Sequence, residues 1–150
     1  MPGMLNMGEM GALALHGMLE MAKRKRRSED RWVSVAEIAD SLGASRHTLH
    51  KVVKRLVQAG LLDSSRGPQG GVKMRSELED VTLLQIVEAV DGELNSGGCL
   101  FARRVCEPTQ RCQFCGITQD LEKVVRDYFI TTTLADLSSR LDPAPNPLVS

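Results

Sequence analysis

The spacing of apolar positions predicts a chain built mostly from short amphipathic helices. Near the N-terminus, apolar and small residues recur at intervals of three and four, which predicts a helix over about residues 7–23. We expect this helix to end in the basic run 23–27, because cationic side chains favour the C-terminal end of a helix. Its predicted apolar stripe consists of Met10, Leu13, Ala14, Gly17, Met18 and Met21.

Two further short helices are predicted on either side of a tight turn. Ser34 and Glu37 have the spacing of a capping box, and Gly43 is placed to end the helix that they begin. Ser45 can cap the next helix, which Gly60 would end. Two apolar helices joined by about three residues are typical of a helix-turn-helix. The predicted buried positions are Val35, Ile38, Ala39 and Leu42, then Leu49, Val52, Val53 and Leu56.

A β-hairpin is predicted directly after the second of these helices. Two short extended runs flank the glycine- and proline-rich stretch 66–71, which is typical of a hairpin turn. A hairpin in this position predicts the wing of a winged helix-turn-helix. The fold class is therefore mainly α with a small β-hairpin wing, and residues 1–92 form the predicted DNA-binding domain.

Further helices are expected beyond the hairpin. Thr82 and Gln85 form a second capping box, which predicts a helix to about Val90. A longer helix is expected over about residues 117–130 and a short one from about Leu134, so that residues 117–141 form the last folded unit. Residues 142–150 hold three prolines and are predicted to be a disordered tail. The predicted apolar face of the longer helix consists of Leu121, Val124, Val125, Tyr128 and Phe129.

The second helix of the helix-turn-helix and the hairpin carry the candidate DNA contacts. In a helix that enters the major groove, residues of the first turn face base edges, and basic residues farther along bind phosphates. A solvated helix face and an ordinary hairpin turn are the alternative explanations. The candidate base or phosphate contacts are Ser45, Arg46, His47, Thr48 and His50, with Lys51, Lys54 and Arg55 for phosphates. The candidate wing contacts are Arg66, Gly67, Gln69 and Gly70.

The charge distribution supports binding to a polyanion. Residues 1–75 hold 13 Lys/Arg and 7 Asp/Glu, a net charge of +6, whereas residues 76–150 hold 6 and 12, a net charge of −6. A basic half suits double-stranded DNA, although the basic run 23–27 alone supplies five of these charges. The chain has no run of apolar residues long enough for a membrane helix and no secretory signal, so we expect a cytoplasmic protein without a membrane partner.

All four cysteines lie within 17 consecutive residues, as Cys99, Cys106, Cys112 and Cys115. In a reducing cytoplasm, clustered thiols indicate a metal site or redox chemistry rather than structural disulfides. We expect them on a loop, over residues 93–116. Nothing in the chain resembles a nucleophile–base pair, a Walker loop or a dinucleotide motif, so no enzyme is predicted.

The chain resembles the IscR/NsrR/CymR-type regulators (the Rrf family) over about residues 7–135. The stretch 61–71 (LLDSSRGPQGG) is similar to that family's wing, the stretch 81–91 (VTLLQIVEAVD) to its next helix, and the cysteines fall where its cluster ligands fall. The resemblance implies a winged helix-turn-helix homodimer joined through a long C-terminal dimerisation helix, which would bind a roughly palindromic operator. It also implies a [2Fe–2S] or [4Fe–4S] iron–sulfur cluster near the dimer interface.

The cysteine spacing leaves the ligand set and the metal open. The gap between Cys99 and Cys106 is one residue longer than in IscR-like proteins, and Cys115 occupies the fourth ligand position. Some family members supply a ligand from the partner's first helix, where His16 and Glu9 are the secondary candidates here. Four thiolates can also hold zinc. A metal-free thiol switch is a third alternative, because Arg103, Arg104 and Arg111 lie nearby and favour thiolates.

The predicted function is a DNA-binding transcriptional regulator whose operator binding responds to its iron–sulfur cluster. Gain, loss or oxidation of the cluster would change the loop, then the following helix and the dimer geometry. Two half-sites about 34 Å apart tolerate little change in the spacing of the two recognition helices. An iron–sulfur electron-transfer protein is the alternative from another functional class.

Overall fold

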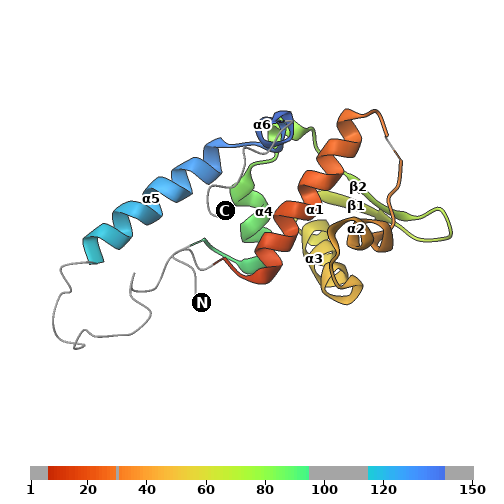
Figure 1. Cartoon of the computed structure of the whole chain (residues 1–150), viewed down its shortest axis with the longest axis horizontal. Helices are drawn as coiled ribbons and strands as arrows, with labels where there is room; N and C mark the ends of the chain where they lie inside the picture. The colour runs from red at the N-terminus through yellow and green to blue at the C-terminus, as the bar shows by residue number, and fades with distance from the viewer. Residues whose placement is uncertain (1–6, 30, 95–114, 141–150) are drawn as a thin grey trace, which may run out of the picture.

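The structure is a computed structural model, which describes residues 7–29, 31–94 and 115–140 (Figure 1). The predicted disordered tail over residues 142–150 lies outside the described residues. In chain order, the elements are α1 (Glu9–Arg26), α2 (Val35–Leu42), α3 (Arg46–Gln58), β1 (Leu62–Ser65), β2 (Gly71–Met74), the 3₁₀ turn η1 (Leu78–Asp80), α4 (Leu83–Asp91), α5 (Cys115–Thr131) and α6 (Leu134–Ser139). The predicted fold class, mainly α with one hairpin, is confirmed.

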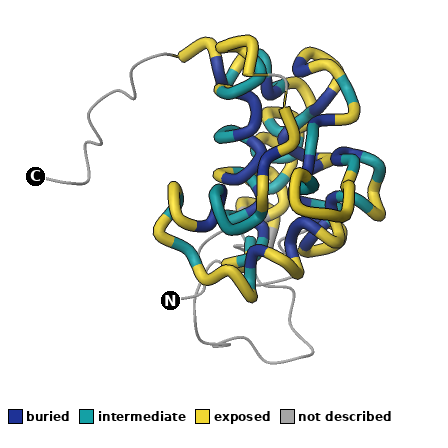
Figure 2. The backbone as a smooth tube through the Cα atoms, turned by 90° about the vertical axis from the view of Figure 1, so that its right-hand side faces the viewer, coloured by how far each residue is buried: buried dark blue, intermediate teal, exposed yellow. Residues whose placement is uncertain are grey.

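A hydrophobic core joins α1, α3, α4 and the hairpin. α1 packs against α3 and α4, and the buried Gly17 of α1 faces the Leu49 side chain of α3. Figure 2 shows buried positions recurring along the backbone. In the predicted apolar stripes of α1, α2 and α3, Met10, Leu13, Val35 and Leu42 are half-buried and the other members are buried. The largest fully buried side chains are Met18, Ile38, Leu49, Leu56, Leu62, Ile86 and Leu134.

The hairpin pairs β1 with β2 in antiparallel register, from Leu62 opposite Met74 to Ser65 opposite Gly71. The segment before α2 also joins it, because the amide and carbonyl of Val33 bond to Val72 at 3.0 and 2.8 Å. This contact attaches the hairpin to the start of α2, so the hairpin and the helix-turn-helix form one structural unit.

α5 extends away from the other helices, and its C-terminal end lies beside α6 (Figure 1). Two backbone hydrogen bonds hold that end: the Leu83 amide donates to Thr132 at 3.0 Å, and the Leu134 amide donates to Val81 at 2.8 Å. The segment that follows α5 is therefore attached to the start of α4. The capping box predicted for α4 is present, and Thr133 with Asp136 forms another at α6.

The bounds of α1 and α5 differ from the predicted ones by one to three residues. α1 ends at Arg26, within the basic run 23–27 as expected and three residues after Lys23, and Arg26 donates a hydrogen bond to Ser138 Oγ at 2.7 Å. α5 begins at Cys115, two residues before the predicted start. Cys115 and Gly116 are therefore helical, although both were predicted to belong to the loop.

Candidate DNA-binding surface and cysteine segment

The turn between α2 and α3 is closed by a left-handed glycine and a serine cap. Gly43 has φ +62° and ψ 28°, a conformation that a residue with a Cβ adopts only with strain. Ser45 caps α3, because its hydroxyl oxygen accepts a hydrogen bond from the Thr48 amide at 3.4 Å. Both roles agree with the sequence prediction, and the turn leaves the first residues of α3 at the surface.

α3 buries one face and exposes the other. Leu49, Val52, Val53 and Leu56 are between 0 and 8% exposed. The predicted DNA contacts on α3 are exposed apart from the half-buried Thr48; these are Ser45, Arg46, His47, His50, Lys51, Lys54 and Arg55. The helix thus keeps its position through its apolar face and presents a polar, basic face to the solvent.

Arg46 already has a partner in the free protein. Its guanidinium binds both carboxylate oxygens of Asp40 at 3.0 Å, across the turn from α2. Both side chains are more than half exposed, and exposed ion pairs contribute at most about 1 kcal/mol. Arg46 can therefore exchange Asp40 for a phosphate or a base at small cost. The sequence analysis missed Asp40, which lies six residues before its partner.

Arg55 has a different environment from the other basic residues of α3. Its Nη1 donates a hydrogen bond to the backbone carbonyl of Val90, near the end of α4. The predicted phosphate contact of Arg55 is not tested by this arrangement. The guanidinium group nevertheless joins α3 to α4 in the free protein, whereas Lys54 beside it lines an open groove.

The hairpin tip depends on glycines for its own geometry. A Cβ on Gly70 would lie 2.3 Å from the Ser65 carbonyl oxygen, and one on Gly71 would lie 2.3 Å from that of Val33. These glycines are therefore required by the hairpin itself, whether or not DNA approaches. Arg66, Gly67 and Gln69 are exposed at the tip and Gly70 is half-buried, so the first three are accessible to a ligand.

A groove of about 640 Å³ lies between the hairpin, α3 and the start of α2. His50, Lys54 and Gln58 contribute to it from α3, and Ser65 and Gly67 contribute from the hairpin. The structure thus brings predicted contacts from both elements to the borders of one groove. Its lining is mostly apolar, and His50 and Lys54 are the basic side chains among its lining residues.

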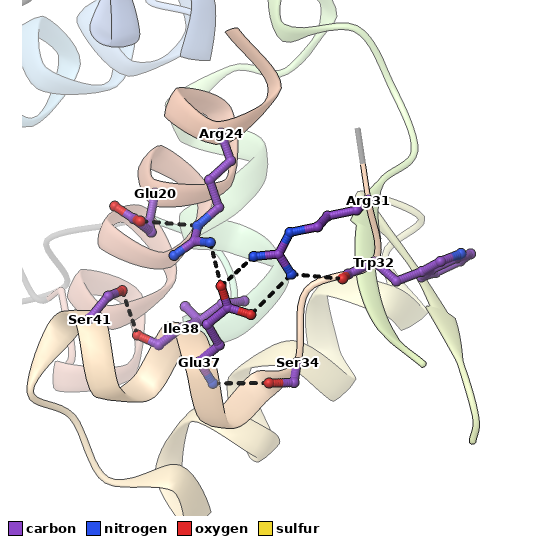
Figure 3. A network of polar contacts seen from close by, with 8 residues as sticks. All are labelled: Glu20, Arg24, Arg31, Trp32, Ser34, Glu37, Ile38 and Ser41. Atoms are coloured by element: carbon purple, nitrogen blue, oxygen red, sulfur yellow. Dashed lines mark hydrogen bonds and ion pairs between the residues drawn. The ribbon is translucent and has the colours of Figure 1, made fainter. Parts of the chain in front are cut away.

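A salt-bridge network around Glu37 fixes α2 to α1 (Figure 3). Glu37 Oε1 accepts from Arg24 Nη1 and from Arg31 Nη2, each at 2.6 Å. The hydrogen bond from Arg31 is the main cause that lowers the pKa of Glu37, and the same bond raises the pKa of Arg31. The predicted capping box is therefore only half formed: Ser34 caps the helix, but the Glu37 carboxylate binds the two arginines instead.

The basic run 23–27 is largely occupied with partners in the same chain. Arg24 binds Glu37, Lys25 binds Glu77 at 2.9 Å, and Arg26 binds Ser138. The charge count of the N-terminal half therefore overstates the positive charge available to DNA. The ion pair between Arg24 and Glu20 could be predicted from the sequence, because the two residues are one helical turn apart. The partners of Lys25 and Arg26 are distant in sequence.

An ion pair that the sequence analysis missed braces the hairpin. Arg75 Nε donates to Asp63 Oδ1 at 2.7 Å, just beyond the paired residues of β2. Asp63 and Arg75 are diagonal neighbours across the two strands, a relation that becomes visible only when the strand register is known.

Of the predicted metal ligands, Cys99, Cys106 and Cys112 lie outside the described residues. Cys115 is the first residue of α5. Within residues 7–29, 31–94 and 115–140, no group of three or more His, Cys, Asp or Glu side chains could hold a metal ion. The candidate site therefore consists of the four thiols as a donor set, and four thiolates are the usual ligands of iron–sulfur clusters.

The two secondary ligand candidates lie on α1. Glu9 is the first residue of that helix and His16 lies seven residues later, so both share one face about 10 Å apart along the axis. Both are exposed. They are accessible to a second chain, as the prediction of a ligand from a partner subunit requires.

In the described part of the chain, no helix is both long and apolar enough to cross a membrane. A protein-family model described as "Rrf2: Iron-dependent Transcriptional regulator" matches residues 7–140. The chain belongs to the Rrf2 family. It is thus a transcriptional regulator with a winged-helix fold, and the predicted family resemblance is confirmed.

Curated and solved proteins agree with the Rrf2 assignment. The chain is 29% identical to the HTH-type transcriptional regulator IscR of Vibrio atlanticus over 127 residues, which covers 85% of this chain and 71% of that protein. CymR, described as the global cysteine regulator of B. subtilis, superposes with a TM-score of 0.71 at 27% identity, covering 90% of this chain and 97% of CymR. IscR of T. potens, at 20% identity, shares the fold with a TM-score of 0.68 and 95% coverage of both chains.

Membership of the Rrf2 family bears on the functional class. The Rrf2 model and the curated relatives describe regulators of transcription, so the prediction that the chain is not an enzyme is confirmed. The alternative of an iron–sulfur electron-transfer protein has no support among them. α3 is accordingly the second helix of the helix-turn-helix, and the β1–β2 hairpin is the wing of the winged-helix fold.

Proposed function

We propose that this Rrf2 regulator binds double-stranded DNA as a homodimer and that an iron–sulfur cluster on its four cysteines controls its operator affinity. The observation that carries the proposal is the position of the cysteines. All four lie between the end of α4 and the first residue of α5, in a chain whose family model is described as iron-dependent.

The proposed DNA contacts come from α3 and the wing. The first turn of α3, with Ser45, Arg46, His47 and Thr48, faces base edges or phosphates, and His50, Lys51 and Lys54 continue this face. The wing adds Arg66, Gly67, Gln69 and Gly70. The groove between the two elements and the exposed cations along it support this assignment.

The proposed dimer forms through α5. Ile117, Leu121, Val124 and Tyr128 follow one another at spacings of three and four, and they are 49, 37, 65 and 49% exposed. This spacing places them on one face of the helix. A contiguous apolar stripe of this kind indicates a protein interface, and a second copy of α5 would cover it symmetrically.

An iron–sulfur cluster, when bound, supplies a group that oxidation, nitric oxide or iron shortage can alter or remove. Cys99, Cys106, Cys112 and Cys115 would hold it, with Glu9 or His16 of α1 as the alternative source of a ligand. Because Cys115 begins α5, the position of that ligand is tied covalently to the proposed dimer helix. The chain's own contribution is to bring the thiols to one site and to connect that site to α5.

Zinc or a metal-free thiol switch remains the alternative for the cysteines. Four thiolates suit a structural zinc site, although only Cys112 and Cys115 have the C-x₂-C spacing of a zinc knuckle. A solved relative, CymR, is described as a cysteine regulator, which favours comparing a thiol switch directly with the cluster.

Anaerobic purification of the full chain tests the cofactor. We expect a coloured protein with visible absorption, containing iron and acid-labile sulfide. Serine substitutions at each cysteine, with Glu9→Gln and His16→Ala in parallel, identify the ligands: an all-cysteine set requires Cys115 and neither α1 residue. A colourless protein with one zinc per chain would end the iron–sulfur proposal, and so would a metal-free protein whose DNA binding follows thiol oxidation.

A further inference from the structure

The last turn of α4 is connected to three other helices, directly before the cysteine segment. Residues 88–94 contact α1, α3 and α5 through side chains or backbone groups. The helix then ends, and residues 95–114 lead to Cys115 at the start of α5. Both ends of the cysteine segment therefore adjoin elements that meet at this turn.

The contact with α3 follows from how α4 ends. In a longer helix, the Val90 carbonyl would accept from the Leu94 amide, four residues later. Here the Leu94 amide donates to the Glu88 side chain at 3.2 Å instead. The Val90 carbonyl needs another donor, and Arg55 of the recognition helix supplies it.

The contact with α1 is equally specific. Asp91 Oδ2 accepts from the Gly8 amide at 2.8 Å, at the N-terminal end of α1, where a carboxylate is favoured. A Cβ on Gly11 would lie 2.2 Å from the same oxygen, so only glycine admits the carboxylate in this position. An exposed hydrogen bond thus joins the end of α4 to the start of α1.

The contact with α5 involves the residue that precedes the cysteine segment. Arg126 Nη1 donates to Glu88 Oε1 at 2.9 Å and to the Leu94 carbonyl at 3.3 Å. Leu94 is itself 7% exposed. A change in the path of the chain after Leu94, or in the position of α5, would therefore act on the same few hydrogen bonds.

We propose that Arg55 is a positioning residue that fixes the recognition helix to the end of α4, rather than a phosphate contact. Through Glu88, Leu94 and Arg126, this connection links the angle of α3 to both ends of the cysteine segment. The coupling to the cysteine segment rests on the proposed function, whereas the positioning of α3 stands without it.

Adjacent residues of α3 provide a matched test. Arg55→Met removes the guanidinium but keeps an apolar stem, and Lys54→Met makes the equivalent change at the neighbouring cation that lines the groove. The probe is a duplex operator selected from a random DNA library with the wild-type dimer. Affinity is measured across about 50–200 mM salt, because each lost phosphate contact lowers the slope of log affinity against log salt by about 1.

We expect Lys54→Met to lower this slope and Arg55→Met to leave it unchanged while operator affinity falls about tenfold. Amide hydrogen exchange at residues 88–94 of the free protein should accelerate in Arg55→Met and stay unchanged in Lys54→Met. A reduced salt slope with unaltered exchange in Arg55→Met would overturn the proposal and restore the phosphate contact.

A second variant covers the case in which Arg55→Met does not fold. Glu88→Gln weakens the hydrogen bonds to Leu94 and Arg126 and lies outside the proposed DNA surface. It should accelerate exchange at residues 88–94 and weaken operator binding without changing the salt slope; wild-type behaviour in both measurements would count against the proposal.

The coupling itself is measured as the ratio of operator affinities with and without the cluster. The ratio should move towards one in Arg55→Met and Glu88→Gln and stay at its wild-type value in Lys54→Met. A wild-type ratio of one would refute the proposed cluster control alone, since the salt slope and the exchange rates still decide the positioning role. A ratio that differs from one and is unchanged in both variants would refute the coupling.

Discussion

α3 and α5 are both amphipathic helices, of 13 and 17 residues, yet they use their apolar faces in opposite ways. Four apolar residues of α3 (Leu49, Val52, Val53 and Leu56) are at most 8% exposed, because α1 and α4 cover them, and Val57 is half-buried. Those of α5 remain 37 to 65% exposed at Ile117, Leu121, Val124 and Tyr128. A similar apolar pattern therefore fixes α3 in the core, whereas α5 packs Phe129 against the core, keeps Val125 half-buried and leaves a separate apolar stripe uncovered.

This difference separates two roles in an Rrf2 regulator. α3 is held by its apolar side, so its basic side is available for DNA. α5 is held at its C-terminal end by the hydrogen bonds around Thr132, so its apolar side is available for a second chain. Substitutions on one helix should therefore change one property of the protein and leave the role of the other helix unaffected.

The largest expected effect is on stability, from truncation of a buried residue of α3. Leu49→Ala should lower the free energy of unfolding by about 2–5 kcal/mol, because it removes a side chain that is 1% exposed and packs beside Gly17. Val124→Ala on α5 is the control and should change monomer stability by less than about 0.5 kcal/mol. Chemical denaturation at low protein concentration measures both; equal losses would contradict the assignment of the two faces.

The next effect is on assembly. Val124→Glu places a charge on the exposed stripe of α5 and should raise the dimer dissociation constant about 100-fold, equivalent to about 2.7 kcal/mol. Gln119→Glu adds the same charge on the opposite side of the helix and should leave the dimer intact. Sedimentation equilibrium measures the dimer dissociation constant of both variants. A Val124→Glu protein that remains dimeric would exclude α5 as the interface.

A smaller effect is expected on DNA binding from the outer face of α3. Lys51→Glu should weaken operator binding about tenfold or more and reduce its salt dependence, since the substitution turns the proposed phosphate contact into a repulsion. Lys123→Glu makes the same charge change on α5 and should have little effect on affinity. Fluorescence anisotropy of labelled operator measures both variants, and comparable losses would point to a general charge effect rather than to contact by α3.

The smallest effect concerns the network that holds α2 beside α1. Glu37→Gln should lower stability by about 1 kcal/mol or less at neutral pH, because Glu37 is partly exposed and solvent screens its ion pairs. The pKa of Glu37 is lowered in the folded state, so its contribution is present above the ordinary value of 4.5 and is lost as the pH falls below it.

Thermal unfolding between about pH 6 and pH 3 tests this pH dependence. The difference between wild type and Glu37→Gln should shrink as the pH falls, and the exposed Glu79→Gln should show no such difference. A stability difference between wild type and Glu37→Gln that grows towards low pH would contradict the lowered pKa of Glu37.

Local features made much of the winged helix predictable from the sequence. The caps at Ser34, Ser45 and Thr82 lie within three residues of their partners, and the apolar spacing of α3 defines its buried face. Such signals depend only on neighbouring residues, so a single sequence contains them. The predictions of an iron–sulfur cluster and of a dimer came from the family resemblance, and the described residues show neither.

Long-range pairings were not predictable in the same way. Arg26 reaches Ser138 across 112 positions, and Arg55 reaches a backbone carbonyl, which has no residue signature at all. The partners of Lys25 and Arg26, the last cations of α1, are likewise distant in sequence. Glu37 has a capping spacing, yet two arginines bind it more strongly than a backbone amide would.

The most direct test of cluster-controlled DNA binding is the operator affinity of one dimer preparation in two states. The protein is purified anaerobically with its cluster, half of it is stripped of iron and sulfide under reducing conditions, and both halves are titrated against the same operator at one salt concentration. The account predicts affinities that differ by about tenfold or more, equivalent to about 1.4 kcal/mol of coupling. Equal affinities of the two states would contradict it.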